Sequence, residues 1–423
     1  MSAGATAVRV GLGILAAGVL VTACSGPPSR PPATRRTGPA TVAPTTRPVL
    51  PVATAPGADA TSEYLSTVAF FNPEDGFGLY MSEGPAGCQA LVGPTTNGGA
   101  TFGPLVAVTS WRCSAPAPVE SLAFDDRGDG FAYGPELYVT HDDGASWTRD
   151  TVQQYGDVLA VAALGASVWM VEGCPAGAPP GPCSMSMLQS GDGGTSWLEA
   201  RGTPPLPTYM APGSAGQTWL VRISQTTAYW VSTPATNGEG VDDSAPLWFT
   251  DDGGATWSLR QIPCEMDASS VALSAAPDGT LFAVCSGEPS AGSQLKSALR
   301  STDDGTTWTT EFSCPVPGPG PPPGCLSDQL ISGYLGGIDA VSAQSAFLVG
   351  ARNPLLVTHD GGAEWQGIAS GIGGDGGGTD QVIFFNPADG LVLGDNDDNQ
   401  EVESIWHTAN GGETWTVVVP RPE

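Results

Sequence analysis

The chain has 423 residues; 40% are hydrophobic and only 14% are charged, whereas glycine (58 residues) and proline (39 residues) are abundant. This is enough apolar sequence for a large core in one or two domains, and the composition favours a turn-rich β protein over a helical one. All 43 acidic residues but only ten of the 15 basic residues lie after residue 58, so this part of the chain carries a formal charge of −33. A surface this acidic repels phosphate groups, which excludes general binding of nucleic acid or anionic lipid.

Residues 1–23 are predicted to be a targeting signal. A single charge, Arg9, precedes the apolar run VGLGILAAGVLV (10–21), which is too short to span a bilayer as a mature helix. The run ends in VTAC (21–24), which resembles the lipobox of bacterial lipoprotein precursors. This resemblance implies cleavage before Cys24, diacylglycerol attachment to its sulfur and anchoring to the outer face of the cell membrane; a secretory signal followed by an unrelated cysteine is the alternative. Both interpretations place the mature chain outside the cytoplasm.

Residues 24–60 are predicted to form a disordered tether that begins with the lipidated Cys24. Proline, threonine and alanine dominate this segment, and it contains four arginines against a single acid. Such a composition cannot bury a core. Fully extended at roughly 3.1 Å per residue, the tether would reach on the order of 110 Å.

From residue 61 to residue 423, one eight-residue pattern recurs seven times: Ser/Thr-x-Asp/Asn-Gly/Asp-Gly-x-Thr/Ser/Glu-Trp/Phe. The copies, called boxes below, occupy residues 95–102, 140–147, 190–197, 250–257, 301–308, 358–365 and 408–415. Successive boxes end 45 to 60 residues apart, a period typical of propellers and other repeat arrays.

Each box follows two apolar runs that alternate with period two and are joined by a short turn, as in VAFFNPEDGFGLY (68–80) and VIFFNPADGLVLG (382–394). The fourth unit, at 217–232, is the most degraded. Such runs, bounded by Asn-Pro, Asp-Gly and Gly turns, are typical of hairpins. One unit therefore reads as strands A and B, a loop, strand C, the box and strand D. Seven such units predict an all-β, seven-bladed β-propeller of four-stranded antiparallel blades over residues 61–423.

The boxes resemble the Asp-box (BNR) repeats of sialidases and sortilin-type receptors. Together with the FFNPxDG hairpins, they resemble most closely the repeats of YCF48/photosystem II assembly factor-like propeller lipoproteins, over roughly residues 61–420. The resemblance implies that each box closes the hairpin between strands C and D, and it implies a role in assembly or stability of another protein. The motif is specific for the fold and poorly specific for function.

The box residues are predicted to be structural. Their glycines supply the positive φ of a tight turn, the acid or amide accepts hydrogen bonds from turn amides, and the aromatic residue buries apolar area. The acids and amides are Asn97, Asp142, Asp192, Asp252, Asp303, Asp360 and Asn410. The aromatic residues are Phe102, Trp147, Trp197, Trp257, Trp308, Trp365 and Trp415. The three histidines, in or beside boxes, are expected to be exposed turn residues.

Eight cysteines remain besides Cys24, and an even number in an oxidising compartment favours four disulfides. Spacing favours the nearest-neighbour pairs Cys88–Cys113, Cys174–Cys183, Cys264–Cys285 and Cys314–Cys325, although about 105 connectivities are open in principle. The first and third pairs are expected to link a B–C region to a D–A region.

The longer connections are predicted to gather on one face, because B–C and D–A loops open on the same side of a propeller. Insertions at 82–92, 104–119, 173–187, 201–216, 233–246, 286–298, 312–336, 367–380 and 395–404 all fall in these two classes. This face is the candidate binding surface; neutral loop variation is the alternative. Its candidate residues are Trp111, Arg112, Tyr155, Arg201, Tyr209, Arg260, Tyr334 and Arg352.

No cofactor is expected. In DNDDNQEVE (395–403), Asp395, Asp397 and Asn399 alternate as in a calcium loop. However, Gln400 and Trp406 stand where an EF-hand needs glycine and glutamate. A solvated acidic loop is favoured, and a generic structural Ca²⁺ site is the alternative.

The sequence favours a non-catalytic protein. The arginines near the loops do not form a recognisable sialidase triad, and no GxSxG elbow occurs. A glycosidase with two carboxylates remains open, since its acids leave no spacing to recognise. The prediction is therefore a monomeric scaffold that binds or assembles an envelope protein or complex, with a carbohydrate-binding protein as the alternative and a glycoside hydrolase as a weaker one.

Overall fold

The computed structural model describes residues 62–422 apart from 126, 154–155, 174–180, 183–184, 201, 203–208, 211–217, 233–243, 265–269, 291–292, 315–334, 351–352, 369–380 and 396–401. Their secondary structure is entirely strand and turn. Among these residues there is no helix of the length and apolarity needed to cross a membrane.

The described residues form seven four-stranded antiparallel sheets, the blades, in the order in which they follow along the chain. Blade 1 contains β1 (Ser62–Phe70), β2 (Gly76–Gly84), β3 (Gly87–Thr95) and β4 (Val106–Trp111); blade 2 contains β5 (Ser121–Phe124), β6 (Gly130–Tyr133), β7 (Leu137–Thr140) and β8 (Thr148–Asp150). Blade 3 contains β9 (Asp157–Leu164), β10 (Ser167–Gly173), β12 (Ser186–Ser190) and β13 (Leu198–Glu199); blade 4 contains β15 (Thr218–Arg222), β16 (Ala228–Ser232), β17 (Ala245–Thr250) and β18 (Ser258–Ile262).

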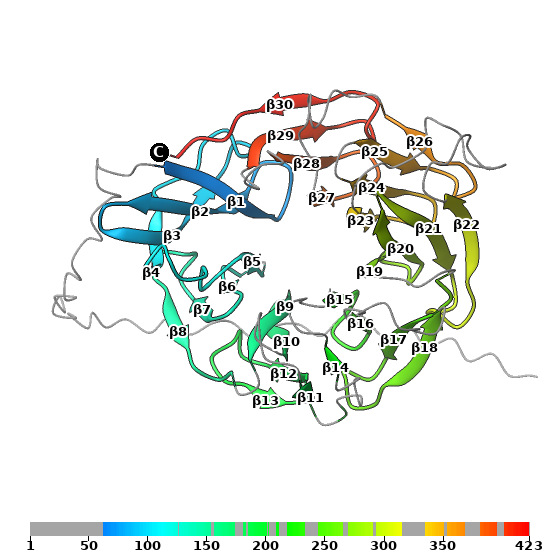
Figure 1. Ribbon diagram of the computed structural model, residues 1–423, viewed down its shortest axis with the longest axis horizontal. Coiled ribbons are helices and arrows are strands. Elements are labelled where there is room, and N and C mark those ends of the chain that lie inside the picture. Colours follow the sequence, from blue (N-terminus) through cyan, green and yellow to red (C-terminus); the bar gives the residue numbers. More distant parts are fainter. Residues whose placement is uncertain are drawn as a thin grey trace, which may run out of the picture. The chain divides into compact units, whose positions relative to one another are not determined.

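The remaining three blades repeat this arrangement. Blade 5 contains β19 (Ser270–Ala275), β20 (Leu281–Ser290), β21 (Ser293–Ser301) and β22 (Thr309–Cys314). Blade 6 contains β23 (Leu335–Ala340), β24 (Ala346–Gly350), β25 (Asn353–Thr358) and β26 (Gln366–Gly367); blade 7 contains β27 (Gln381–Phe384), β28 (Gly390–Asp395), β29 (Val402–Thr408) and β30 (Thr416–Val418). Within each blade the strands pair in sequence order, and the first strand lies at the inner edge of the ring (Figure 1). The predicted seven-bladed propeller is confirmed.

The core lies between blades. Seven clusters of buried apolar residues each join two neighbouring blades; one packs Tyr229 and Leu247 of blade 4 against Val271 and Leu281 of blade 5. The second strands are buried on both faces, as in β10 with burial at nearly every position. Burial on both faces requires nearly continuous apolar runs, as in VWMV of β10.

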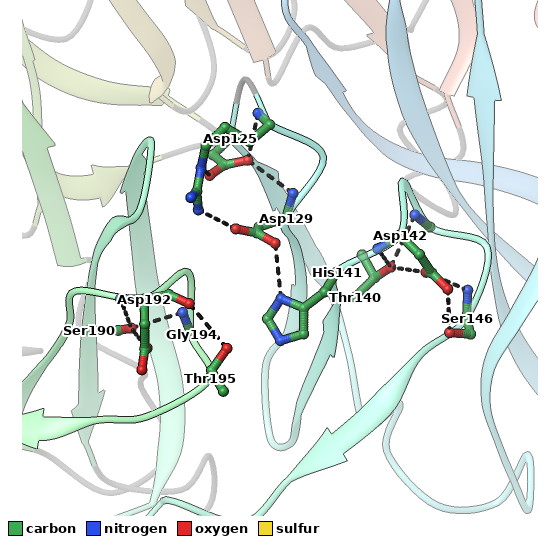
Figure 2. Close-up of polar contacts among 12 residues, drawn as sticks. Asp125, Asp129, Thr140, His141, Asp142, Ser146, Ser190, Asp192, Gly194 and Thr195 are labelled. Atoms are coloured by element: carbon green, nitrogen blue, oxygen red, sulfur yellow. Dashed lines mark hydrogen bonds and ion pairs between the residues drawn. The ribbon is translucent and has the colours of Figure 1, made fainter. Parts of the chain in front are cut away.

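The boxes form the turns between the third and fourth strands, as expected. In all seven, the hydroxyl of the first residue accepts a hydrogen bond from the amide of the glycine at the fifth position, at 2.8–3.0 Å. The acid or amide accepts the amide hydrogen bond of the seventh box residue at 2.8–3.1 Å. Figure 2 shows the boxes of blades 2 and 3, around Asp142 and Asp192. These bonds pair the backbone amides of the turn with side-chain oxygens of the same eight residues, so the box stabilises its own turn.

The box aromatic side chains pack between blades rather than only within their own blade. Trp257 of blade 4 meets the ring of Trp169 in blade 3 edge-on, with centroids 6.0 Å apart. The second box glycine is also an inter-blade contact: a Cβ on Gly194 would lie 2.6 Å from the ring of Phe131 in blade 2. The box therefore closes its own hairpin and holds the preceding blade.

The ring closes where blade 7 meets blade 1, and each of the two blades keeps its own four strands. The two blades therefore abut. Leu65 and Phe102 of blade 1 share a buried cluster with Leu391 and Ile405 of blade 7. The C-terminal segment then crosses back to blade 1, where the carbonyl of Arg421 accepts a 2.9 Å hydrogen bond from the amide of Phe102.

One buried carboxylate ties three inner strands together. Asp339 on β23 accepts a 2.6 Å hydrogen bond from the amide of Phe384 on β27 and a longer one, at 3.5 Å, from the hydroxyl of Ser274 on β19. That hydroxyl accepts a bond from the amide of Ala340. Burial raises the pKa of Asp339 to about 6.

Candidate functional site

A cavity of about 670 Å³ opens at the end of the blades that carries the B–C and D–A connections, called the looped face below. It spans the closure of the ring, with walls from blades 7, 1 and 2. Its lining residues are Tyr64, Ser66, Thr67, Met81, Ser82, Glu83, Cys88, Trp111, Ala117, Glu120, Ser121, Gln381, Leu393 and Val402. This volume is in the range of small-molecule and peptide-side-chain pockets.

The strand order explains why these distant residues meet. Glu83 lies near the end of the second strand of blade 1, and the ladder pairs Cys88, near the start of the third strand, with Trp111 at the end of the fourth. Glu120 precedes the first strand of blade 2. All of these positions lie at the same end of antiparallel strands, so the side chains surround one opening.

The wall that carries Trp111 is held from two sides. A disulfide joins Cys88 to Cys113, with 5.1 Å between their Cα atoms. The turn between β2 and β3 packs against the same segment, because a Cβ on Gly87 would lie 2.8 Å from the carbonyl oxygen of Trp111. Gly87 also has a φ of 126°, which disfavours any other residue. Trp111 is therefore presented by a rigid segment.

Towards the centre of the ring, the cavity is lined by polar side chains of inner strands. The hydroxyl of Thr67 on β1 donates to the side-chain oxygen of Gln381 on β27 at 3.2 Å, and the Gln381 amide donates to the carbonyl of Val68 at 3.3 Å. These two bonds cross from blade 1 to blade 7. The floor of the cavity is thus also part of the ring closure.

The cavity is electrostatically negative. Glu83 and Glu120 supply its charge, and both side chains are exposed at the rim. Partial burial against the cavity wall, and secondly the charge of Asp157 at the start of β9, raise the pKa of Glu120 above its usual value. Burial likewise raises the pKa of Glu63, next to the lining residue Tyr64. The site is therefore suited to a positive or hydrogen-bond-donating group.

The opposite face, which carries the boxes, shows polar groups engaged with one another. In blade 2, Asp125 accepts hydrogen bonds from the amides of Arg127 and Asp129 at 2.8 and 2.9 Å, and His141 contacts Asp129 at 2.9 Å (Figure 2). The guanidinium of Arg127 is paired with both acids. This network ties the turn between β5 and β6 to the box of the same blade, so its chemistry is structural.

The histidines are only partly as expected. The His141 side chain is 46% exposed, and His359 is also exposed. The expectation is wrong for His407, which is half-buried at the ring closure, where its Nε2 lies 2.8 Å from the carbonyl oxygen of Gly98 in blade 1. Its burial lowers its pKa. Closure of the ring, which no local pattern reveals, covers this side chain.

Seven of the eight candidate residues of the looped face divide into three groups. Trp111 lines the cavity, and the neighbouring Arg112 is exposed on the same segment. Tyr209 lies in β14 (Tyr209–Met210). Tyr155, Arg201, Tyr334 and Arg352 lie outside the described residues.

The placement of Arg260 on the looped face is wrong. Its guanidinium lies over the ring of Phe249, 4.1 Å from the centroid, and donates to the carbonyls of Asp303 and Asp304 in the box of blade 5. Arg260 follows the box of its own blade by three residues, so it lies at the box end of β18. There it joins neighbouring blades.

Most of the insertions fall between the second and third or the fourth and first strands, as predicted. The prediction is wrong for residues 104–119, which contain the whole of β4, the fourth strand of blade 1. Two further insertions are not loops. Residues 82–92 and 286–298 belong largely to hairpins. β1 and β4 flank β2 and β3 almost to the tip, whereas β20 and β21 extend beyond their neighbouring strands. The insertions at 173–187 and 201–216 pair with each other through β11 (Gly181–Pro182) and β14. That pairing places both on the same face.

Two of the four predicted disulfides are present, Cys88–Cys113 and Cys264–Cys285. The first joins the start of β3 to a D–A segment, as expected. In the second, Cys285 lies within β20 itself, and its partner follows β18. The pairs Cys174–Cys183 and Cys314–Cys325 fall outside the described side chains.

The calcium candidates also fall outside the described side chains, since β28 ends at Asp395 and residues 396–401 are not described. In the part of the chain that the structure describes, no three His, Cys, Asp or Glu side chains come together as a metal site would need. Sequence reasoning missed Tyr64, Glu83 and Glu120. The one local feature that could have identified these three residues is their position near the strand ends on the looped face.

No protein-family model and no curated protein matches the sequence. Among solved structures, the chain is similar to YCF48 bound to a D1 peptide, with 18% identity, coverage of 82% of this chain and 94% of that one, and a TM-score of 0.52. It is also similar to YCF48 from Cyanidioschyzon merolae (13% identity, 80% and 94% coverage, TM-score 0.49) and to a GH74 xyloglucanase from Xanthomonas campestris (15%, 84% and 64%, 0.33). At such identity, the first similarity establishes that the two chains share the β-propeller fold.

Proposed function

We propose that this protein is an extracytoplasmic, lipid-anchored, non-catalytic propeller that binds an envelope protein or complex at its looped face. In this proposal residues 1–23 are the signal, Cys24 carries the lipid, residues 24–60 form the tether and residues 61–423 form the binding domain. The observation that carries the proposal is the cavity across blades 7, 1 and 2, whose Trp111 wall is fixed by a disulfide.

Two further observations support it. The two disulfides are typical of a protein that folds in an oxidising compartment. A propeller of the same fold, YCF48, has been solved with a D1 peptide bound. A protein segment is therefore the class of ligand that we propose for this chain, with the chain acting as a monomer.

Carbohydrate binding is the second candidate, because Tyr64 and Trp111 place two aromatic rings beside two carboxylates. Aromatic rings and acids together are suited to sugar rings and their hydroxyls. Glycoside hydrolysis is a weaker form of this candidate. It would need Glu83 and Glu120 to flank a glycosidic bond, with their carboxyl groups roughly 5–5.5 Å apart for a retaining enzyme or roughly 6.5–9.5 Å apart for an inverting one.

Capture from native envelope extract separates these functions. The full-length chain is immobilised with its disulfides intact, and both proteins and glycans are identified. Trp111→Ala and Glu120→Gln test the looped face, and Leu198→Ala, at a 76% exposed position on β13, is the matched control. Melting curves verify that each variant is folded.

The proposal expects one dominant protein complex, retained by the control and lost with at least one of the looped-face variants. Retention of glycan alone would replace the proposed function by carbohydrate binding. Equal retention of the protein by all variants would show that the looped face is not the binding surface.

A further inference from the structure

The cavity has a one-sided charge. Among the described residues that line it, Glu83 and Glu120 are the charged ones, and neither lysine nor arginine occurs in that set. The surrounding propeller carries a formal charge of −33, so the potential in the cavity is negative at long range as well. A bound anion is excluded on this ground, and a cation is favoured.

The lining also contains the partners that an organic cation uses beyond a carboxylate. Tyr64 and Trp111 both border the cavity, and an aromatic face attracts a guanidinium or ammonium group. Arginine benefits most, because its planar group stacks on a ring while donating to a carboxylate. The methyl-bearing and aliphatic lining, Met81, Leu393 and Val402, suits the apolar stem of such a side chain.

The surroundings of Glu120 disfavour the charged form of its carboxyl group. Partial burial, and secondly the charge of Asp157 at the start of blade 3, raise the pKa of that carboxyl. A cation bound at Glu120 favours the charged carboxylate and thereby offsets this cost. The fixed position of Trp111 reduces the entropy lost on binding.

We infer that the cavity between blades 7, 1 and 2 binds an arginine side chain from an extended segment of the partner protein. This inference rests on the proposed function, because it names the chemical group through which the partner is held. The opening accommodates one side chain and its flanking backbone rather than a folded domain. Glu83 and Glu120 bind the guanidinium, and Trp111 or Tyr64 stacks on it.

Fluorescence anisotropy with the full-length chain tests the inference. The probe is a fluorescein-labelled peptide, Gly-Ala-Arg-Ala-Gly, and its matched form has citrulline, which keeps the shape of arginine without the charge. The salt concentration is about 0.15 M, which screens the general field of the acidic surface. The variants are Glu120→Gln and Trp111→Leu, with Glu413→Gln, an exposed acid in the box of blade 7, as the charge-matched control.

The arginine peptide is expected to bind about tenfold more tightly than the citrulline peptide. Glu120→Gln and Trp111→Leu should each weaken it by about five- to tenfold, and Glu413→Gln by less than about twofold. Equal binding of both peptides, or equal weakening by Glu120→Gln and Glu413→Gln, would overturn the inference. N-acetylargininamide serves as competitor, and displacement of the peptide with the same affinity would show that the site takes a free guanidinium compound instead.

The outcome is separable from that of the proposed function. If the captured envelope protein binds the wild type and Glu120→Gln alike, but loses affinity for Trp111→Ala, the scaffold stands and the arginine site fails. If the peptide binds as expected and no protein is captured, the site stands and the scaffold fails.

Discussion

Replacing Asp339 by asparagine should make the stability of the propeller less dependent on pH. Asp339 lies on the inner strand of blade 6 and links it to the inner strands of blades 5 and 7. Burial raises its pKa from 3.8 to about 6. A group whose pKa is raised on folding contributes stability that is fully present below pH 4 and is lost as the pH rises through 6.

The size of this effect follows from the shift. A difference of about two pKa units at about 1.4 kcal/mol each corresponds to roughly 3 kcal/mol between pH 4 and pH 7.5. In Asp339→Asn, the amide oxygen can still accept the bond from Phe384, and the buried charge is absent at every pH. The variant should therefore match the wild type near pH 4 and exceed it at pH 7.5, by up to that amount.

Equilibrium unfolding in urea at pH 4, 6 and 7.5 measures this difference directly. Other titrating groups, such as the box acids, change both proteins alike and cancel in the comparison. A stability difference that is the same at all three pH values would refute the reasoning. So would a variant that is the less stable protein at pH 7.5, because the charged carboxylate would then be the favoured form in the fold.

Two further predictions concern the contacts that hold the ring. Gly194→Ala places a Cβ against the ring of Phe131 at a φ of 87°, and it should lower the free energy of unfolding by about 2 kcal/mol or more. Gly191→Ala, three residues earlier and with open space around it, should leave the stability unchanged. Melting curves that shift equally for the two variants would contradict this prediction. Deletion of the last three residues removes the carbonyl of Arg421 from the amide of Phe102 and should speed hydrogen exchange at that amide, while deletion of the final residue alone should not. Unchanged exchange in the longer deletion would show that the C-terminal segment does not stabilise the closure.

The boxes illustrate what can be predicted from local sequence. Each is a turn whose hydrogen bonds begin and end within eight residues, as with Thr250, Asp252 and Gly254. The first of the two glycine positions needs a positive φ, and Asp143 and Asp304 adopt it at 56° and 57°. The pattern Gly/Asp at this position therefore follows from backbone geometry alone. The hydroxyl of Thr256, at the other end of the box, donates a hydrogen bond to Asp252. This bond also joins residues that are close together along the chain.

The cavity illustrates the opposite case. Its residues run from Tyr64 to Val402 and meet only because blade 7 packs against blade 1. Trp111 could be singled out as an aromatic residue beside a cysteine in an insertion. Glu83 and Glu120 have no such signal among 43 acidic residues. The prediction fails for Arg260, because its position along β18, three residues after a box, places it towards the face that carries the boxes.

By itself, the sequence determined the number of blades, the order of strands within each blade and two disulfide pairs, because each depends on contacts between residues close together along the chain. The tertiary structure alone decided how the ring closes, which side chains it buries and where a cavity remains. Those features depend on residues of blades 7, 1 and 2, which no short-range pattern relates. The physical reason is that hydrogen bonds in turns and hairpins join residues close together along the chain. The packing of one blade on the next joins residues that are far apart along the chain and meet only in the closed ring.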